Sequence, residues 1–148
     1  MITPQDADLV VDEIRSSPET GHGLRKLAME KLSNLPGYNW SGVYRFERNM
    51  LVLDEFFGAP TDHTQIEVGV GVCGTAIAEG TNQIVKDVRK LDNYLACSLE
   101  TRSEIVVLVR KGAEILGQID IDGHEVGAFD ESDEKFLERL ANVLAERW

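Results

Sequence analysis

The stretch from Ser103 to Asp122, SEIVVLVRKGAEILGQIDID, decides the fold class of this chain. It holds two runs rich in branched aliphatic residues, separated by a turn at Lys111-Gly112. Two such runs joined by a glycine-containing turn predict an antiparallel β-hairpin. In the second strand, Asp120 and Asp122 point to one face and the isoleucines to the other, because side chains alternate along a strand.

Further elements are predicted on both sides of this hairpin by periodicity and by capping or turn residues. The predicted strands outside it span 40–47, 50–57, 64–68 and 83–88, and three predicted helices span 3–16, 75–79 and 130–148. A fourth predicted helix carries Leu24, Leu27, Ala28 and Leu32 and stops at Pro36-Gly37. Arg48-Asn49 is expected to close a second hairpin, and Asp130 and Asp133 to form a capping box. Glycine-rich residues 69–74 and polar residues 89–102 are expected to be loops.

Short links between strands favour an antiparallel sheet, and helices at both ends can cover one of its faces. We therefore predict an α+β fold with a central six-stranded antiparallel sheet. The N- and C-terminal helices pack on one face, and a loop-covered pocket lies on the other. All of residues 1–148 are expected to form one domain: helices in 1–36, sheet and pocket in 38–123, and a closing helix in 130–148.

The composition excludes several functional classes. The 148 residues carry a net charge of −11, which argues against nucleic acid as a partner because phosphates require clustered lysine and arginine. We expect no membrane association, because no apolar run approaches the ~20 residues of a membrane span. Two cysteines and no recognisable export signal predict a reducing, cytoplasmic location.

The carboxylates are the first candidates for chemistry. Glu104 shares a strand face with Val106 and Leu108, so we expect burial to raise its pKa and make it a proton donor. The alternative is that Glu104 lies at the solvated start of its strand. For Asp120 and Asp122 the alternative is an ordinary amphipathic strand with a wet polar face.

The two cysteines and one tryptophan are further candidates. Cys73 lies in Gly-Val-Cys-Gly at the start of a helix, where the helix dipole and unpaired N–H groups favour a thiolate, and where flanking glycines can cradle a carboxylate. Cys97 lies in the polar loop, near Arg102. Trp40 could form a pocket wall. The alternatives are a small buried Cys73, a Cys97 that seats the loop, and a core Trp40.

Several segments together resemble a GAF domain, and within that superfamily the free methionine-R-sulfoxide reductases. The segments that carry the resemblance are Asn39-Trp40-Ser41-Gly42-Val43-Tyr44, Gly71-Val72-Cys73-Gly74-Thr75-Ala76, Val85-Lys86-Asp87-Val88, Leu95-Ala96-Cys97, Ser103-Glu104-Ile105-Val106-Val107 and Asp120-Ile121-Asp122. The resemblance runs from about residue 38 to the C-terminal end of the chain, and the N-terminal helices match only in position.

The resemblance implies a reaction and a set of roles. The family's nucleophilic thiolate matches Cys97, which would attack the sulfoxide sulfur while a carboxylic acid protonates the departing oxygen. A sulfenic acid would remain on Cys97, and a second thiol such as Cys73 would convert it to a disulfide. Thioredoxin or another dithiol would then reduce that disulfide. The implied acid and substrate-binding residues are Glu104, Asp122, Asp120, Asp87 and Trp40, with Val72 and Gly74 offering backbone N–H groups to the substrate carboxylate.

Four positions depart from the family pattern. His63 stands where family members usually carry the resolving cysteine, so resolution passes to Cys73 or an external thiol, or turnover has been lost and the pocket kept. The family's histidine is Tyr94 here, its aspartate after the nucleophile is Ser98, and its proline after Ile-Val-Val is Leu108.

The loss of that cysteine gives weight to an alternative function, a non-catalytic sensor domain that binds a small amino-acid-like or redox ligand. Cyclic nucleotides and bilins are not expected, because the Asn-Lys and Cys-His pairs of those GAF domains are missing. No cofactor and no metal are expected, since His63, Cys73, Cys97 and His124 lack zinc-finger spacing. We expect a homodimer, because the terminal helices of GAF domains often pair between chains.

Overall fold

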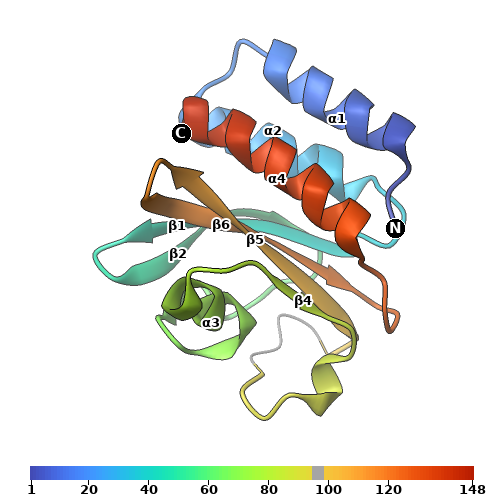
Figure 1. The fold of residues 1–148 in the computed structure, drawn as a ribbon, viewed down its shortest axis with the longest axis vertical. Coiled ribbons are helices and arrows are strands. Elements are labelled where there is room, and N and C mark those ends of the chain that lie inside the picture. Colours follow the sequence, from blue (N-terminus) through green and yellow to red (C-terminus); the bar gives the residue numbers. More distant parts are fainter. Residues whose placement is uncertain (95–98) are drawn as a thin grey trace.

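The computed structural model describes residues 1–94 and 99–148 and arranges them as a sheet between two helical layers (Figure 1). The helices are α1 (Pro4–Ser16), α2 (Gly21–Ser33), α3 (Gly71–Glu79) and α4 (Glu131–Glu146), with a 3-10 turn η1 (Val88–Lys90). The strands are β1 (Trp40–Glu47), β2 (Met50–Phe57), β3 (Gln65–Glu67), β4 (Gln83–Val85), β5 (Ser103–Lys111) and β6 (Glu114–Gly123).

The six strands form one sheet in the order β3-β2-β1-β6-β5-β4, and every neighbouring pair is antiparallel. Helices α1, α2 and α4 lie on one side of the sheet, and α3 lies on the other with the loop that follows β4 (Figure 1). The predicted fold class is therefore confirmed.

The β1–β2 hairpin begins and ends where the sequence predicts. Arg48 and Asn49 have φ angles of 53° and 65°. Left-handed backbone at both central residues is typical of the two-residue turns whose twist matches that of paired strands. This turn sets the pairing of β1 with β2 from Glu47 back to Tyr44, and an extra residue in β2, Asp54, shifts the register between Tyr44 and Val43.

The helix-facing side of the sheet carries the main hydrophobic core. Alternate residues of the central strands point into it; α4 covers those of β5 and β6 with its apolar stripe, and α2 lies over β1 and β2. The buried residues that these strands and α4 contribute to the core are Val43, Ile105, Val107, Val109, Ile119, Ile121, Phe136, Leu137, Leu140 and Leu144. Helix α4 starts at the predicted capping box, in which Asp130 accepts from the Asp133 backbone and Asp133 accepts from the Asp130 backbone.

The opposite face carries a second, smaller cluster beneath α3. The buried members are Trp40, Tyr44, Leu51, Ile66, Val72, Cys73, Ala76, Ile77, Val106 and Leu108. Side chains of β5 therefore divide between two environments: odd-numbered residues face the main core, and even-numbered residues face α3.

Two predicted boundaries are wrong for identifiable physical reasons. Helix α3 starts at Gly71 rather than residue 75, so the expected glycine-rich loop is partly the first turn of the helix. Strand β4 ends at Val85 rather than residue 88, because the Asp87 side chain accepts from the Arg89 backbone and starts η1.

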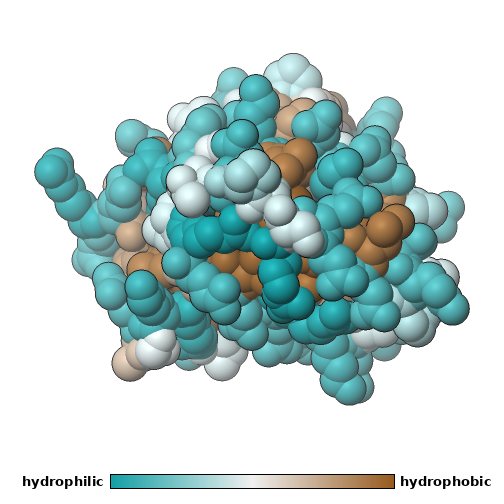
Figure 2. Space-filling model, turned by 90° about the horizontal axis from the view of Figure 1, so that it is seen from above, coloured by the Kyte–Doolittle hydropathy of each residue, from teal (hydrophilic) through white to brown (hydrophobic). Residues whose placement is uncertain are grey.

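Hydrophilic side chains cover most of the surface seen from above in Figure 2, with small apolar areas between them. This agrees with the acidic composition. Within the described ranges, 1–94 and 99–148, no helix is both long and apolar enough to cross a lipid bilayer.

A close contact within β1 shapes the α3 side of the sheet. A Cβ atom on Gly42 would lie 2.3 Å from Cη2 of Trp40, so the missing side chain lets the indole lie along the strand. The indole stacks on Phe56 with 5.6 Å between ring centroids, and its Nε1 donates to the Ala59 carbonyl at 3.0 Å. Gly42 thus makes room for the buried tryptophan.

We expect Gly42→Ala to lower the free energy of unfolding by about 1–3 kcal/mol, the usual cost of overpacking a core. Thermal unfolding of the purified variant measures this. Ser41→Ala on the same strand is the control, because Ser41 is buried and its Oγ has no hydrogen-bond partner among the described residues. A Gly42→Ala variant as stable as Ser41→Ala would contradict the proposed contact.

Candidate active site

A row of paired residues crosses four strands on the α3 side of the sheet. Trp40 of β1 pairs with Asp122 of β6, Asp122 pairs with Glu104 of β5, and Glu104 pairs with Val85 of β4. Antiparallel neighbours in register have side chains close together on one face. The sheet therefore brings Trp40, Asp122 and Glu104 together from segments far apart in the sequence.

Asp120 lies in the adjacent row, between Gly42 and Val106. The exposed fractions of Glu104, Asp120 and Asp122 are 2%, 0% and 1%. The two alternative interpretations, a solvated strand start and a wet polar face, are therefore wrong. The alternation of β6 predicts which side the aspartates occupy, and the cover over that side removes them from water.

Cys73 lies on the first turn of α3, next to the carboxylate cluster. Its Sγ lies 3.8 Å from Oε1 of Glu104, and the residue is 4% exposed. One donor atom from each of Cys73, Glu104 and Asp120 lies within 4.8 Å of the other two. Cys73 is thus the small buried cysteine of the alternative interpretation, but its thiol contacts a carboxyl group instead of lying in purely apolar surroundings.

Glu104 and Asp120 hold their protons more tightly than exposed acids do. Burial raises the pKa of Glu104 well above its usual value, and the nearby charges of Asp120 and Asp122 raise it further. Burial also raises the pKa of Asp120, an effect that hydrogen bonds with Glu104 and Cys73 partly offset. The raised pKa predicted for Glu104 is confirmed, with desolvation as its main cause.

The backbone N–H groups in the first turn of α3 were expected to bind a substrate carboxylate, and the structure differs from this expectation. The Gly74 N–H donates to the Val70 carbonyl at 2.9 Å, and the Gly71 N–H donates to Oδ1 of Asn93 at 3.2 Å. The helix therefore already uses the Gly74 N–H that was expected to bind substrate. Gly74 serves close packing, since a Cβ there would lie 2.5 Å from the Glu67 carbonyl oxygen. The role of the buried Val72 stays a prediction.

The remaining candidates are placed differently. Asp87 lies outside the carboxylate cluster and forms an ion pair with Arg89, whose Nε lies 3.0 Å from Oδ1; the hydrogen bond from Arg89 lowers the pKa of Asp87. His63 is half-buried, and its carbonyl accepts from the Tyr44 hydroxyl at 2.9 Å. Cys97, like the rest of 95–98, lies outside the described residues.

Two buried polar residues beside the cluster escaped the sequence analysis. Gln118 is fully buried, and its Nε2 donates to the Cys73 carbonyl at 3.0 Å, which ties α3 to β6. The alternation that singles out Asp120 and Asp122 includes Gln118 and could have found it. Thr101 lies 3.5 Å (Oγ1 to Oδ2) from Asp122. No sequence pattern marks Thr101, because it precedes β5 in an irregular segment.

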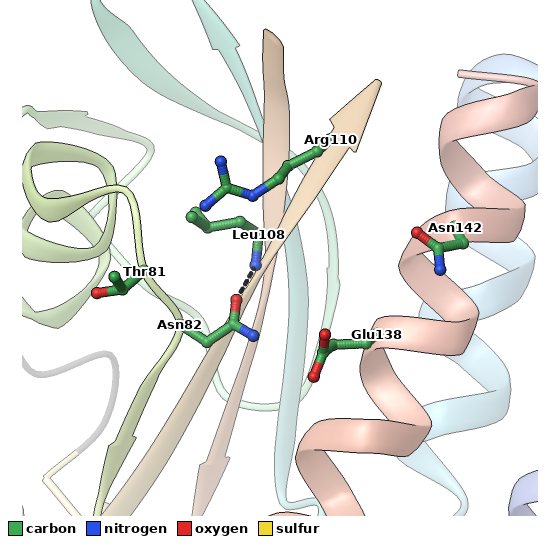
Figure 3. Close-up of a pocket in the computed structure, with 6 residues that line it drawn as sticks. All are labelled: Thr81, Asn82, Leu108, Arg110, Glu138 and Asn142. Carbon is green, nitrogen blue, oxygen red and sulfur yellow. Dashed lines mark hydrogen bonds between the residues drawn. The ribbon is translucent and has the colours of Figure 1, made fainter. Parts of the chain in front are cut away.

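Two cavities border these elements. A cavity of about 120 Å³ between α3 and β4 is lined by Val72 and Val85, among other residues. Val72 precedes Cys73 in the sequence, and Val85 pairs with Glu104 across the sheet. A larger one, about 320 Å³, lies between β5 and α4 (Figure 3). Its lining is Thr81, Asn82, Leu108, Arg110, Glu138 and Asn142, and Asn82 accepts from the Leu108 backbone at 2.9 Å. None of the described site residues predicted from the sequence lines this larger cavity.

Comparison with known proteins places this arrangement in a family. Residues 24–146 match the family model described as GAF domain. The chain is 39% identical over 127 residues to the free methionine-R-sulfoxide reductase of Saccharomyces cerevisiae, covering 83% of this chain and 66% of that protein. It is 39% identical over 118 residues to the Escherichia coli protein of the same name, covering 80% of this chain and 69% of that one. It thus spans about two thirds of the length of these curated relatives.

The fold gives the same result. The free methionine-R-sulfoxide reductase of Neisseria meningitidis, solved in complex with its substrate, superposes with a TM-score of 0.90 at 32% identity. That comparison covers 99% of this chain and 92% of the other. Such likeness extends over the sheet and the helices together. The chain therefore belongs to the GAF domain family and, within it, to the free methionine-R-sulfoxide reductases.

Proposed function

We propose that this chain reduces free L-methionine (R)-S-oxide to methionine. The observation that carries the proposal is the buried cluster of Glu104, Asp120 and Asp122, because such a cluster can both supply a proton and bind an ammonium group. Relatives that align over most of this chain are named for that reaction.

The chemistry requires one nucleophilic sulfur and one proton donor. In the proposed mechanism the thiolate of Cys97 attacks the sulfoxide sulfur, the sulfoxide oxygen is protonated, and methionine leaves as Cys97 becomes a sulfenic acid. A second thiol then displaces water to form a disulfide, and a dithiol such as thioredoxin reduces that disulfide. Two electrons pass from the dithiol to the sulfoxide in each cycle.

The cluster's electrostatics support Glu104 as the proton donor. Its raised pKa means that the carboxyl group keeps a proton at a pH where exposed glutamates have lost theirs. Asp122 and Asp120 then supply negative charge for the substrate ammonium, beside the wall formed by Trp40. We propose these roles together, because one desolvated group of three carboxylates cannot ionise fully without strong mutual repulsion.

Cys97→Ser should abolish methionine formation, whereas Cys73→Ser should still release methionine in a single turnover if Cys97 is the nucleophile. The assay supplies each epimer of free methionine sulfoxide with dithiothreitol or thioredoxin and quantifies methionine. Binding of sulfoxide without methionine formation by the wild type would favour the sensor alternative. Single-turnover activity that survives Cys97→Ser would exclude Cys97 as the nucleophile.

Glu104→Gln should lower kcat by about 10²–10⁴-fold, the usual contribution of a positioned general acid. In the wild type, kcat should fall as pH rises through the raised pKa of Glu104, because the donor then loses its proton. Glu114→Gln is the matched control, since Glu114 is exposed at the start of β6. A wild-type pH profile that the Glu104→Gln variant reproduces would exclude Glu104 as the donor.

Glu104→Gln, which is expected to lower kcat, should raise the stability of the folded chain at neutral pH. A folded pKa above the ordinary 4.5 means that the native state binds more protons than the unfolded chain, so wild-type stability falls as pH rises from 4.5 through the raised value. Glu104→Gln removes the part of this dependence that Glu104 contributes, while the raised pKa of Asp120 still contributes its own part. Thermal unfolding at several pH values should therefore show a higher Tm for Glu104→Gln than for the wild type at neutral pH.

His63→Cys should speed turnover coupled to thioredoxin, because it restores a thiol where the family usually carries the resolving cysteine. His63→Ser is the control for loss of the imidazole alone. Equal steady-state rates for the two variants would mean that resolution already proceeds by another route, through Cys73 or an external thiol.

The biological setting stays a set of predictions. Thioredoxin or another dithiol as reductant, a homodimer, and a cytoplasmic location follow from the resemblance and the composition. Light scattering coupled to gel filtration tests the oligomeric state directly.

A further inference from the structure

The cluster beneath α3 combines two kinds of metal ligand in one buried place. Cys73 offers a sulfur, and Glu104 and Asp120 offer carboxylate oxygens, with the three donor atoms within 4.8 Å of one another. Exposed acidic residues often gather without any ligand, but these three are 4%, 2% and 0% exposed. They also come from three different elements, α3, β5 and β6, so the tertiary fold assembles the group.

The distances suit a small tetrahedral cation. In a zinc site with Zn–S of about 2.3 Å and Zn–O of about 2.0 Å, sulfur and oxygen ligands lie about 3.5 Å apart. The Cys73 Sγ and Glu104 Oε1 atoms are 3.8 Å apart, so small rotations of the side chains would bring both to one ion. A thiolate among the ligands favours zinc-like cations over magnesium or calcium, which prefer oxygen alone.

Two buried polar atoms, one on Glu104 within the group and one on Gln118 beside it, give a second indication of a ligand. Oε2 of Glu104 is shielded from solvent and has no hydrogen-bond partner among the described residues. The same holds for Oε1 of Gln118, whose amide lies against Cys73 because Nε2 donates to the Cys73 carbonyl. Buried polar atoms without a partner are costly, and an ion is one of the partners that removes this cost.

From this geometry we propose that Cys73, Glu104 and Asp120 bind one Zn²⁺ ion, and that the ion inhibits the enzyme. Three protein ligands leave a fourth position open. This ligand set differs from the combination of His63, Cys73, Cys97 and His124, whose spacing in the sequence is unlike that of a zinc finger. Inhibition follows because the ion occupies the carboxylate oxygens of the proposed site and neutralises charge needed for the substrate ammonium. The binding half of the proposal stands alone, whereas the inhibition half rests on the proposed function.

Cobalt binding tests the site without any activity assay. The chain has two cysteines, so in a Cys97→Ser background the sulfur ligand of a cobalt thiolate absorption band is Cys73. We expect that band to appear with one Co²⁺ per chain and to disappear on addition of Zn²⁺. Tris(carboxyethyl)phosphine keeps the thiol reduced without the dithiol that would compete for metal.

Variants in the same background identify the ligands. Cys73→Ser should abolish the band. Glu104→Gln and Asp120→Asn should each weaken Zn²⁺ binding by at least about 10–100-fold. In metal sites generally, a loss of this size follows the removal of a residue that only hydrogen-bonds to a ligand. Glu114→Gln should bind as the parent does. Absence of the band, or equal affinity of Glu104→Gln and Glu114→Gln, would overturn the site.

Inhibition is measured separately on the wild-type chain. Methionine formation should fall as Zn²⁺ saturates the site and should recover fully when a chelator is added. Binding at the expected residues with unchanged turnover would overturn the inhibition while leaving the metal site standing. A wild-type chain that forms no methionine without added metal would contradict the proposed function, and a cobalt band in the Cys97→Ser background would still support the site.

Discussion

Three carboxyl groups and a thiol share one desolvated space between the sheet and α3, and the rest of the site depends on that crowding. Water cannot screen Glu104 from Asp120 and Asp122, so the group lowers its energy by keeping a proton. The same crowding makes the space attractive to any positive charge that can enter it. The three proposed roles of the cluster, donating a proton, binding an ammonium group and binding a cation, thus share one electrostatic constraint.

The sheet can hold these buried carboxyl groups because one of its faces packs in the main hydrophobic core while the other carries the polar cluster. On β5, Ile105, Val107 and Val109 are locked into the main core beneath α4, while Glu104 alternates to the other side. The large apolar contact on the helical face stabilises strands whose polar side chains would otherwise be expensive to bury. Gln118 adds a direct tie between β6 and α3 through the Cys73 carbonyl. The site is therefore held from the sheet and from the covering helix at once.

Much of this arrangement was predictable from local pattern, and the exceptions have physical causes. Alternation in Gln118-Ile119-Asp120-Ile121-Asp122 predicts which residues share a face, and the β1–β2 hairpin follows from Arg48-Asn49. Alternation cannot say whether a face is wet, which is why the burial of Asp120 was left open. The start of α3 was missed because glycine disfavours helix by intrinsic propensity, whereas packing of Gly74 against the Glu67 carbonyl requires it there. Asp87 matches a substrate-binding position of the family in sequence, but in the structure it forms an ion pair with the nearby Arg89.

The loop after β2 is fastened to the sheet by two aromatic side chains that donate hydrogen bonds to main-chain carbonyls. Trp40 donates to the carbonyl of Ala59, and Tyr44 donates to the carbonyl of His63. A carbonyl is present whatever the side chain, so neither anchor constrains which amino acid occupies either position. Evolution could accordingly exchange the chemistry displayed at residue 63 without remaking the scaffold that presents it, and relatives with different recycling routes could share one architecture.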